Sequence, residues 1–274
     1  MNAADDGGRR RWRARLGPLY ALAVALQFFT RLPMPRDLDP TPEDLARASP
    51  WLPVVGGLVG GLLALVALSL AATPLVPGAR VVPLLLVGVL LTGAFHEDGL
   101  ADAADGLFGG WTREDKLRIM RDSRIGSYGA LAVVLLLGGR AGALLGSGPG
   151  AWPVMLVVAH VLGRWSTLPL LVSLPYARAE GAGPGKPLVE GTGAIQVVLG
   201  STIALMIAFA VGGNTGLAAM GIALALTFTA ARFLRQQLGG ITGDALGAVN
   251  VVVELATLTV FAAAHPATHS PFVG

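Results

Sequence analysis

The chain has 274 residues, of which 53% are hydrophobic and 14% are charged, whereas about 25% of residues are charged in a typical soluble domain. This much apolar surface excludes intrinsic disorder and argues against an ordinary soluble globule. Cysteine is absent, which excludes disulfides and thiolate metal sites. The net charge of +3 is small, so we expect no nucleic-acid partner. The composition predicts an all-α, polytopic transmembrane helical bundle.

We treat residues 1–274 as a single integral membrane domain with a basic N-terminal tail at 1–15 and a C-terminal tail at 265–274. The first apolar segment, 16–30, follows the basic tail and resembles the start of a signal peptide. Residues 31–35 offer no small-residue cleavage site, so we expect the segment to be retained. We predict that it lies at the membrane interface or re-enters without crossing.

From residue 52 onward, the chain contains apolar runs that could each cross the bilayer, since a transmembrane helix needs about 20 apolar residues. Two of these runs carry charges, Arg164 in one and Glu254 in another. Glycines spaced four apart at 56–61 predict close helix–helix packing. The predicted spans are 52–72, 81–95, a run that begins at 125 and continues past Arg140, 151–174, two spans within 191–231 that turn at 212–214, and 245–264.

Basic residues mark three loops, which the positive-inside rule places in the cytoplasm together with the N-terminus. The predicted spans then alternate consistently if 16–30 does not cross. The short turns at 74–80, 147–150 and 212–214 fall on the other side, as does the C-terminus. The three basic loops lie within 113–124, 178–186 and 232–235.

The segment 96–107 is the chemically most informative one, because Asp98, Asp102 and Asp105 follow one another at i, i+4 and i+7. On a helix these carboxylates fall within an arc of about 60°. Carboxylates near a bilayer are costly unless a proton or a cation neutralises them. Oxygen ligands without His or Cys suit Mg²⁺ or Mn²⁺, and Mg²⁺ commonly shares substrate phosphates. The alternative is a solvated acidic helix start, which explains Asp98 better than the other two.

A second group of candidates lies at 121–124, directly before a predicted span. Arg121 and Arg124 could clamp a diphosphate, and Asp122 could add a metal oxygen, with Ser123 between them. Arg164, inside an apolar run, needs a partner, which is either an anionic substrate or an acidic residue on another helix.

The segment 239–250 joins two predicted spans and contains Thr242, Asp244 and Asn250, which could line the same site. The alternative is a glycine-rich turn in which Asp244 is a helix N-cap. His96 lacks metal-ligand spacing, so we predict a packing or capping histidine rather than a ligand.

Several of these segments, in this order and spacing, resemble the cobalamin synthase family, whose activity is that of adenosylcobinamide-GDP ribazoletransferase or cobalamin-5′-phosphate synthase. One departure is 182–186, where the family pattern has an aromatic residue. The matching segments are FHEDGLADAADG at 95–106, IMRDSRIGSYG at 119–129, FTRLP at 29–33, LPYAR at 174–178 with EG at 180–181, and GITGD at 240–244 with LGA at 246–248 and Glu254.

The resemblance implies a transferase of late vitamin B12 assembly, integral to the cytoplasmic (inner) membrane. It would join adenosylcobinamide-GDP to α-ribazole or α-ribazole 5′-phosphate, releasing GMP and forming adenosylcobalamin or its 5′-phosphate. Mg²⁺ is the expected cofactor, the active site would face the cytoplasm, and an oligomer is compatible with the sequence. We expect Asp98, Asp102 and Asp105 to hold the metal and to act in catalysis with Asp122 and Asp244. The expected substrate-binding residues are Arg121, Ser123, Arg124, Arg164, Thr242 and Asn250.

Two other functions fit an acidic membrane helix. CDP-alcohol phosphotransferases also place Asp-Gly-rich helices in membranes, but their D-G-x-x-A-R opening is absent, since Asp98-Gly99 is followed by Leu100-Ala101-Asp102. A cation transporter would place such residues at the bilayer midplane of broken helices. Here the stripe lies at a helix end beside a basic loop, which favours the enzyme.

Overall fold

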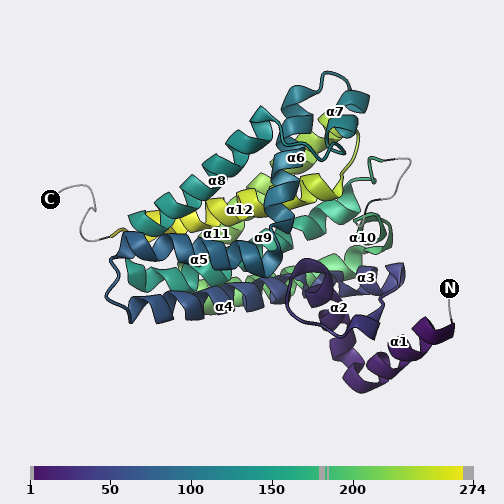
Figure 1. Ribbon diagram of the computed structural model, residues 1–274, viewed down its shortest axis with the longest axis horizontal. Coiled ribbons are helices and arrows are strands. Elements are labelled where there is room, and N and C mark those ends of the chain that lie inside the picture. Colours follow the sequence, from purple (N-terminus) through teal and green to yellow (C-terminus); the bar gives the residue numbers. More distant parts are fainter. Residues whose placement is uncertain (1–2, 179–182, 184, 268–274) are drawn as a thin grey trace.

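The computed structural model describes residues 3–178, 183 and 185–267. In this part of the chain the regular structure is helical, apart from two isolated bridges that pair Ser147 with Pro266 and Tyr176 with Ile241. The long helices run side by side along the long axis of the molecule (Figure 1). The predicted all-α class is therefore confirmed.

Long apolar helices form the body of the molecule, with α9 at its centre, packed against α4, α11 and α12. Within the described ranges, five helices are long and apolar enough to cross a membrane (residues 42–71, α8, α9, α11 and α12), and the bent pair of α5 and α6 adds a sixth candidate. These findings support an integral membrane protein. The body consists of α4 (Leu52–Ala71), α5 (Pro77–Thr92), α8 (Ser127–Gly146), α9 (Trp152–Ser173), α11 (Ala194–Leu238) and α12 (Gly243–Ala264).

Shorter helices gather at one end of this body (Figure 1). Among them, α2 has ten residues, or about 15 Å of helix, and is too short for a hydrocarbon core of about 30 Å. This length agrees with our expectation that 16–30 does not cross. The shorter helices are α1 (Ala3–Leu16), α2 (Tyr20–Phe29), α3 (Pro42–Ala48), α6 (Phe95–Gly109), α7 (Arg113–Ile119) and α10 (Lys186–Gly191), with single 3₁₀ turns at Gly17–Leu19, Arg36–Leu38 and Ser49–Trp51. A further 3₁₀ turn, Pro149–Ala151, joins α8 to α9.

The helix α11 folds back on itself at Gly213, whose φ of 55° and ψ of −139° break the helical path. Its two halves touch where Gly216 lies against the backbone carbonyl of Ala208. A side chain at Gly216 would prevent this approach. The predicted turn at 212–214 is therefore confirmed.

The chain also breaks between α5 and α6, which meet at an angle of 87°. The predicted span 81–95 ends earlier, at Thr92, because Gly93 and Ala94 adopt left-handed φ values of 65° and 58°. Gly93 terminates α5 in the manner of a helix C-cap glycine. This turn directs α6, which carries the acidic stripe, across the neighbouring helices.

The segments that carry the predicted basic clusters meet at one end of the molecule, but Arg232 and Arg235 lie within α11 and not in the predicted loop. Arg113 donates from Nε to the carbonyl of Leu238 at 2.7 Å and from Nη2 to the carbonyl of Ala177 at 2.7 Å. At the other end, the amide of Gly148 donates to the carbonyl of His265 at 3.1 Å. The segments at 113, 177 and 238 thus lie together at one end, and the α8–α9 turn and the end of α12 lie together at the other.

Glycines bring α4 and α9 into close contact. Gly56 lies against the backbone of His160, and a Cβ atom on Gly60 would be 2.6 Å from the Cα atom of Val157. The predicted helix–helix packing at 56–61 is therefore confirmed.

Candidate active site

The acidic helix α6 uses small residues to approach its neighbours closely. A Cβ atom on Gly99 would be 3.0 Å from the carbonyl oxygen of Asp244, the second residue of α12. The buried face of α6 is made largely of glycine and alanine, including Ala101 and Ala103. This contact places the N-terminal half of the acidic stripe beside the start of α12.

A cavity of about 210 Å³ lies at this contact, and its charged lining comes from Asp98, Asp244 and Arg178. Asp244 accepts a hydrogen bond from Arg178 Nη2 in an ion pair. Among the residues that the structure describes, the Nε atom of Arg178 is buried without a hydrogen-bond partner. The cavity therefore combines two carboxylates with a guanidinium whose donor capacity is incompletely used.

Backbone hydrogen bonds hold Arg178 in this position. The amide of Ala177 donates to the carbonyl of Ile241 at 2.9 Å, and the amide of Ile241 donates to the carbonyl of Pro175 at 2.9 Å. These bonds align the segment before Arg178 with the segment before Asp244. Sequence reasoning did not select Arg178 as a site residue; its position in the LPYAR segment was the available signal.

Asp102 lies one helical turn beyond Asp98 on α6, but it does not line the cavity. Carboxylates on one helix face disfavour one another in the ionised form unless a proton or a cation neutralises them. Within the described ranges, however, no group of three or more His, Asp or Glu side chains is placed so that it could hold a metal ion.

Asp105, the third member of the stripe, is engaged elsewhere. Its Oδ2 accepts the amide of Gly126 at 2.7 Å and its Oδ1 accepts the amide of Gly129 at 2.9 Å. The residue is 8% exposed and does not line the cavity. Asp105 thus caps the start of α8 and anchors the preceding loop, and it does not form an open cluster with Asp98 and Asp102.

The predicted diphosphate clamp at 121–124 lies on a surface loop outside the cavity. Arg124 donates from Nη2 to Asp122 Oδ2 at 2.7 Å and from Nε to Oδ1 at 3.0 Å. These side-chain hydrogen bonds, with one from the Arg124 amide, lower the pKa of Asp122 to about 2. Asp122 is therefore a poor proton acceptor at neutral pH. Arg121 and Ser123 are exposed on the same loop.

This loop nevertheless begins beside the cavity. Arg178 Nη2 lies 3.5 Å from the carbonyl oxygen of Met120, to which it donates, and the hydroxyl of Thr242 lies 4.0 Å from the Met120 sulfur. A movement of the loop would therefore change the hydrogen bond from Arg178 to Met120.

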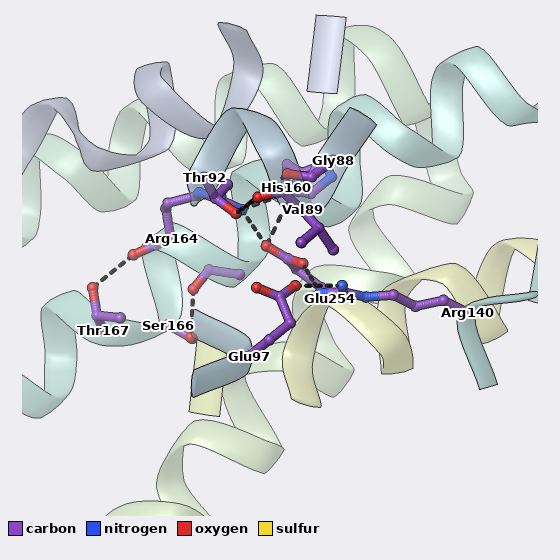
Figure 2. A network of polar contacts seen from close by, with 11 residues as sticks. Gly88, Val89, Thr92, Glu97, Arg140, His160, Arg164, Ser166, Thr167 and Glu254 are labelled. Carbon is purple, nitrogen blue, oxygen red and sulfur yellow. Dashed lines mark hydrogen bonds and ion pairs between the residues drawn. The ribbon is translucent and has the colours of Figure 1, made fainter. Parts of the chain in front are cut away.

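A buried charge network lies behind the cavity, with Glu254 at its centre (Figure 2). Arg140 donates from Nη1 to Glu97 Oε1 and from Nη2 to Glu254 Oε2, both at 2.6 Å. Arg164 also donates to Glu254, and His160 Nδ1 lies 3.0 Å from Glu254 Oε1. The network joins α6, α8, α9 and α12.

Of the two partners considered for Arg164, the structure supplies the acidic residue on another helix. Arg164 is 1% exposed and does not line the cavity, so the predicted contact with substrate does not form here. The reason is physical: a guanidinium inside an apolar bundle requires a carboxylate, and Glu254 provides it.

The remaining predicted residues near α12 are mostly structural. Thr242 is the N-cap of this helix, since its hydroxyl accepts the amide of Ala245 at 3.1 Å; the alternative that Asp244 is the cap is therefore wrong. Asn250 is 1% exposed and lies outside the cavity. His96 is 3% exposed and stacks on Phe29, with 7° between the rings, as expected of a packing histidine.

Part of the predicted family pattern lies outside the described residues, namely the EG pair at 180–181 and residues 182 and 184 of the departing segment.

Comparison with known proteins supports one family. The family model described as cobalamin-5-phosphate synthase matches residues 21–262. The chain is 39% identical over 235 residues to an adenosylcobinamide-GDP ribazoletransferase of Shewanella baltica, covering 85% of this chain and 89% of that protein. It is 38% identical over 246 residues to an adenosylcobinamide-GDP ribazoletransferase of Ralstonia nicotianae, covering 89% of this chain and 95% of that protein. No solved structure matches the chain.

Proposed function

The chain belongs to the cobalamin-5-phosphate synthase family and has adenosylcobinamide-GDP ribazoletransferase activity in cobalamin biosynthesis, and from this premise we propose how its site performs the transfer. The reaction joins adenosylcobinamide-GDP to α-ribazole or its 5′-phosphate and releases GMP. Family membership favours this reaction over the CDP-alcohol and cation-transport alternatives.

The observation that carries the proposal is the shared cavity of Asp98, Asp244 and Arg178. A guanidinium recognises phosphate oxygens through charge-assisted hydrogen bonds. Arg178 binds the diphosphate of the donor, and Asp244 holds Arg178 in place through their ion pair. The buried and unpartnered Nε of Arg178 offers a further donor.

The carboxylates of this region fit Mg²⁺ by their chemistry, because they offer oxygen ligands without His or Cys. Magnesium commonly uses one or two protein carboxylates and completes its shell with water and substrate phosphates. A set of three preassembled carboxylates is therefore unnecessary, and we assign Asp98 and Asp102 to the metal, with Asp105 as the loop anchor. When bound, the metal would neutralise charge on the diphosphate.

In the transfer, a ribazole hydroxyl attacks the phosphorus attached to cobinamide. A new phosphorus–oxygen bond forms as the bond to the bridging oxygen breaks, and GMP leaves with that oxygen. The hydroxyl proton passes to a carboxylate of the cavity wall, where Asp98 and Asp244 stand. Positioning and charge neutralisation supply most of the rate, as in phosphoryl transfer generally. We keep Arg121 and Arg124 as candidate contacts of the donor, because their loop begins beside Arg178 at Met120.

The location of the enzyme follows from its charge. The end of the bundle that holds the cavity also collects the basic loops, and such loops remain in the cytoplasm. We therefore place the protein in the cytoplasmic (inner) membrane with the site facing the cytoplasm.

The proposal is tested by GMP release from adenosylcobinamide-GDP and α-ribazole. Asp102→Asn should lower the rate by at least about 100-fold, as expected for the loss of an electrostatic contact in the transition state. Chelation of Mg²⁺ should stop the wild-type reaction, and added Mg²⁺ should restore it.

Asp115→Asn is the matched control, because Asp115 lies on α7 and pairs with Arg118 outside the cavity. This variant should keep the wild-type rate, and both variants should insert into membranes in wild-type amounts. A near-normal rate in Asp102→Asn would remove the acidic stripe from the mechanism.

A further inference from the structure

The same cavity has a second wall that the transfer chemistry does not use. Phe28 and Phe29 of α2 face Phe95 and His96 at the start of α6, and all four line the cavity. The charged lining described above comes from α6, α12 and the segment at 178. One cavity thus joins an aromatic wall to a phosphate-binding edge.

The aromatic wall is ordered by contacts between its own rings. The centroid of Phe95 lies 5.9 Å from that of Phe28 and 6.1 Å from that of Phe29, in edge-to-face geometry. His96 stacks on Phe29 at 6.4 Å. Phe95 remains 38% exposed, so its surface is available to a further ring.

We propose that this aromatic wall binds the flat, apolar base of the acceptor nucleoside, the benzimidazole ring of α-ribazole. The base stacks beside Phe95, and the attached ribose then extends toward Asp98 and Arg178. Aromatic side chains provide such platforms for flat heteroaromatic rings. This inference rests on the proposed function, because it names the subsite for one of the two substrates.

The lining favours the benzimidazole over the guanine of the donor, which is also flat. Guanine presents a hydrogen-bonding edge that needs polar partners, and the two hydroxyls of the lining, those of Thr167 and Tyr176, each already make one hydrogen bond. Thr167 donates to the carbonyl of Arg164 at 2.8 Å, and the Tyr176 hydroxyl accepts the amide of Gly183 at 3.2 Å.

The rest of the lining is apolar, and a benzimidazole with its methyl groups can occupy it without unpaired polar atoms. The corrin ring with its amide side chains is too large for a cavity of about 210 Å³. The apolar lining includes Leu52, Leu171, Leu188 and Leu246.

The test is steady-state kinetics of the purified protein with each substrate varied in turn. Phe95→Leu keeps an apolar side chain but removes the flat ring. We expect the KM for α-ribazole to rise by about tenfold, within the range for loss of one base–aromatic stack, with kcat and the KM for adenosylcobinamide-GDP little changed. Phe95→Tyr, which restores the ring, should return the KM for α-ribazole to near the wild-type value.

Phe108→Leu is the matched control on the same helix, since Phe108 is 62% exposed and packs against Tyr128 away from the cavity. It should leave both KM values unchanged. A rise in the KM for the donor alone would overturn the inference in favour of guanine or the corrin, and unchanged KM values in Phe95→Leu would also overturn it.

A failure of the proposed function would look different, since the wild-type protein would then release no GMP from either substrate pair. Direct binding of α-ribazole without donor gives a second readout. Phe95→Leu should weaken this binding by a similar factor, and equal affinity in the variant and the wild type would contradict the subsite.

Discussion

In the proposed mechanism Arg178 is the donor-binding residue, and its ion pair with Asp244 and its contact with Met120 connect the cavity to the loop at 121–124. Replacing Arg178 by Ala removes charge-assisted hydrogen bonds to the diphosphate. We expect kcat/KM for adenosylcobinamide-GDP to fall by about 100-fold or more, with most of the loss in KM. Arg178→Lys should recover part of it, because lysine keeps the charge but loses the planar donor geometry.

The control for this prediction is Arg118→Ala, which removes the same charge from an exposed α7 residue paired with Asp115. Its kcat/KM should remain at the wild-type value. Equal losses in the Arg178 and Arg118 variants would indicate a general charge effect rather than a contact with the donor.

Asp122 gives a prediction about pH. Arg124 lowers the pKa of Asp122 to about 2, so its carboxylate is ionised at every pH above about 4 and cannot supply the acidic limb of a pH–rate profile near neutrality. Asp122→Asn should therefore change the rate by a constant factor between about pH 5 and 9, and the midpoint of the acidic limb should stay unchanged. A shift or loss of that limb would identify Asp122 as the proton acceptor.

The sequence identified the acidic residues of the site but not the different role that each of them has. Asp98 and Asp105 belong to one periodic stripe. Asp98 lines the cavity, whereas Asp105 accepts the backbone amides of Gly126 and Gly129, which lie 21 and 24 residues later in the chain. Arg178 and Asp244 are 66 positions apart and meet through the bridge between Tyr176 and Ile241. Such long-range contacts leave no local pattern in a single sequence.

At the scale of elements, the buried network around Glu254 fixes how α6 sits on the bundle. Glu97 is the third residue of α6 and directly precedes Asp98, and it reaches Glu254 through Arg140. A displaced guanidinium would therefore shift the start of the acidic helix. We infer that the network positions Asp98 without touching the substrate.

Glu254→Gln should destabilise the protein by about 3–5 kcal/mol, because it leaves Arg140 and Arg164 without their shared carboxylate. Thermal unfolding in detergent should show a midpoint lower by about 10 °C. Activity at a temperature where the variant is folded should also fall, since α6 loses its support. Glu190→Gln, at an exposed residue paired with Lys186, should leave the midpoint unchanged. An equally stable Glu254→Gln protein would contradict the role of the network.

Hydropathy predicted most of the long helices, because apolar length is what a membrane requires of them. It missed the end of α5 by three residues, since Phe95 is as apolar as the helix before it while Gly93 and Ala94 turn the backbone. Backbone angles are set by tertiary packing at such a break, and apolar composition does not encode them.

At the scale of the whole molecule, the cavity lies at one end of the bundle, so the orientation of the protein in the membrane decides from which side the substrates reach it. The cavity, the start of α12 and the basic loops lie at one end, while the α8–α9 turn and the end of α12 lie at the other. In the proposed reaction the donor carries a charged diphosphate and the acceptor a polar ribose, so both must approach from an aqueous side. If the basic end faces the cytoplasm, the site opens to the cytoplasm as well.

Reporter fusions test this orientation directly. A reporter that is active only outside the cytoplasm should work when inserted at Gly213, in the turn of α11, and should be inactive when inserted at Gly239, which joins α11 to α12. A reporter that requires the cytoplasm should give the opposite pattern. The physical reason is that Arg232 and Arg235 adjoin the second position, and basic residues near the ends of spans resist translocation.

Replacing Arg232 and Arg235 together by Gln serves as a charge control, because the other basic loops should still hold the orientation, and the reporter pattern should persist. If the reporter that works only outside the cytoplasm were active at Gly239 and inactive at Gly213, the protein would have the opposite orientation in the membrane. That orientation would also place the cavity outside the cytoplasm, since the start of α12 and the cavity share one end of the bundle.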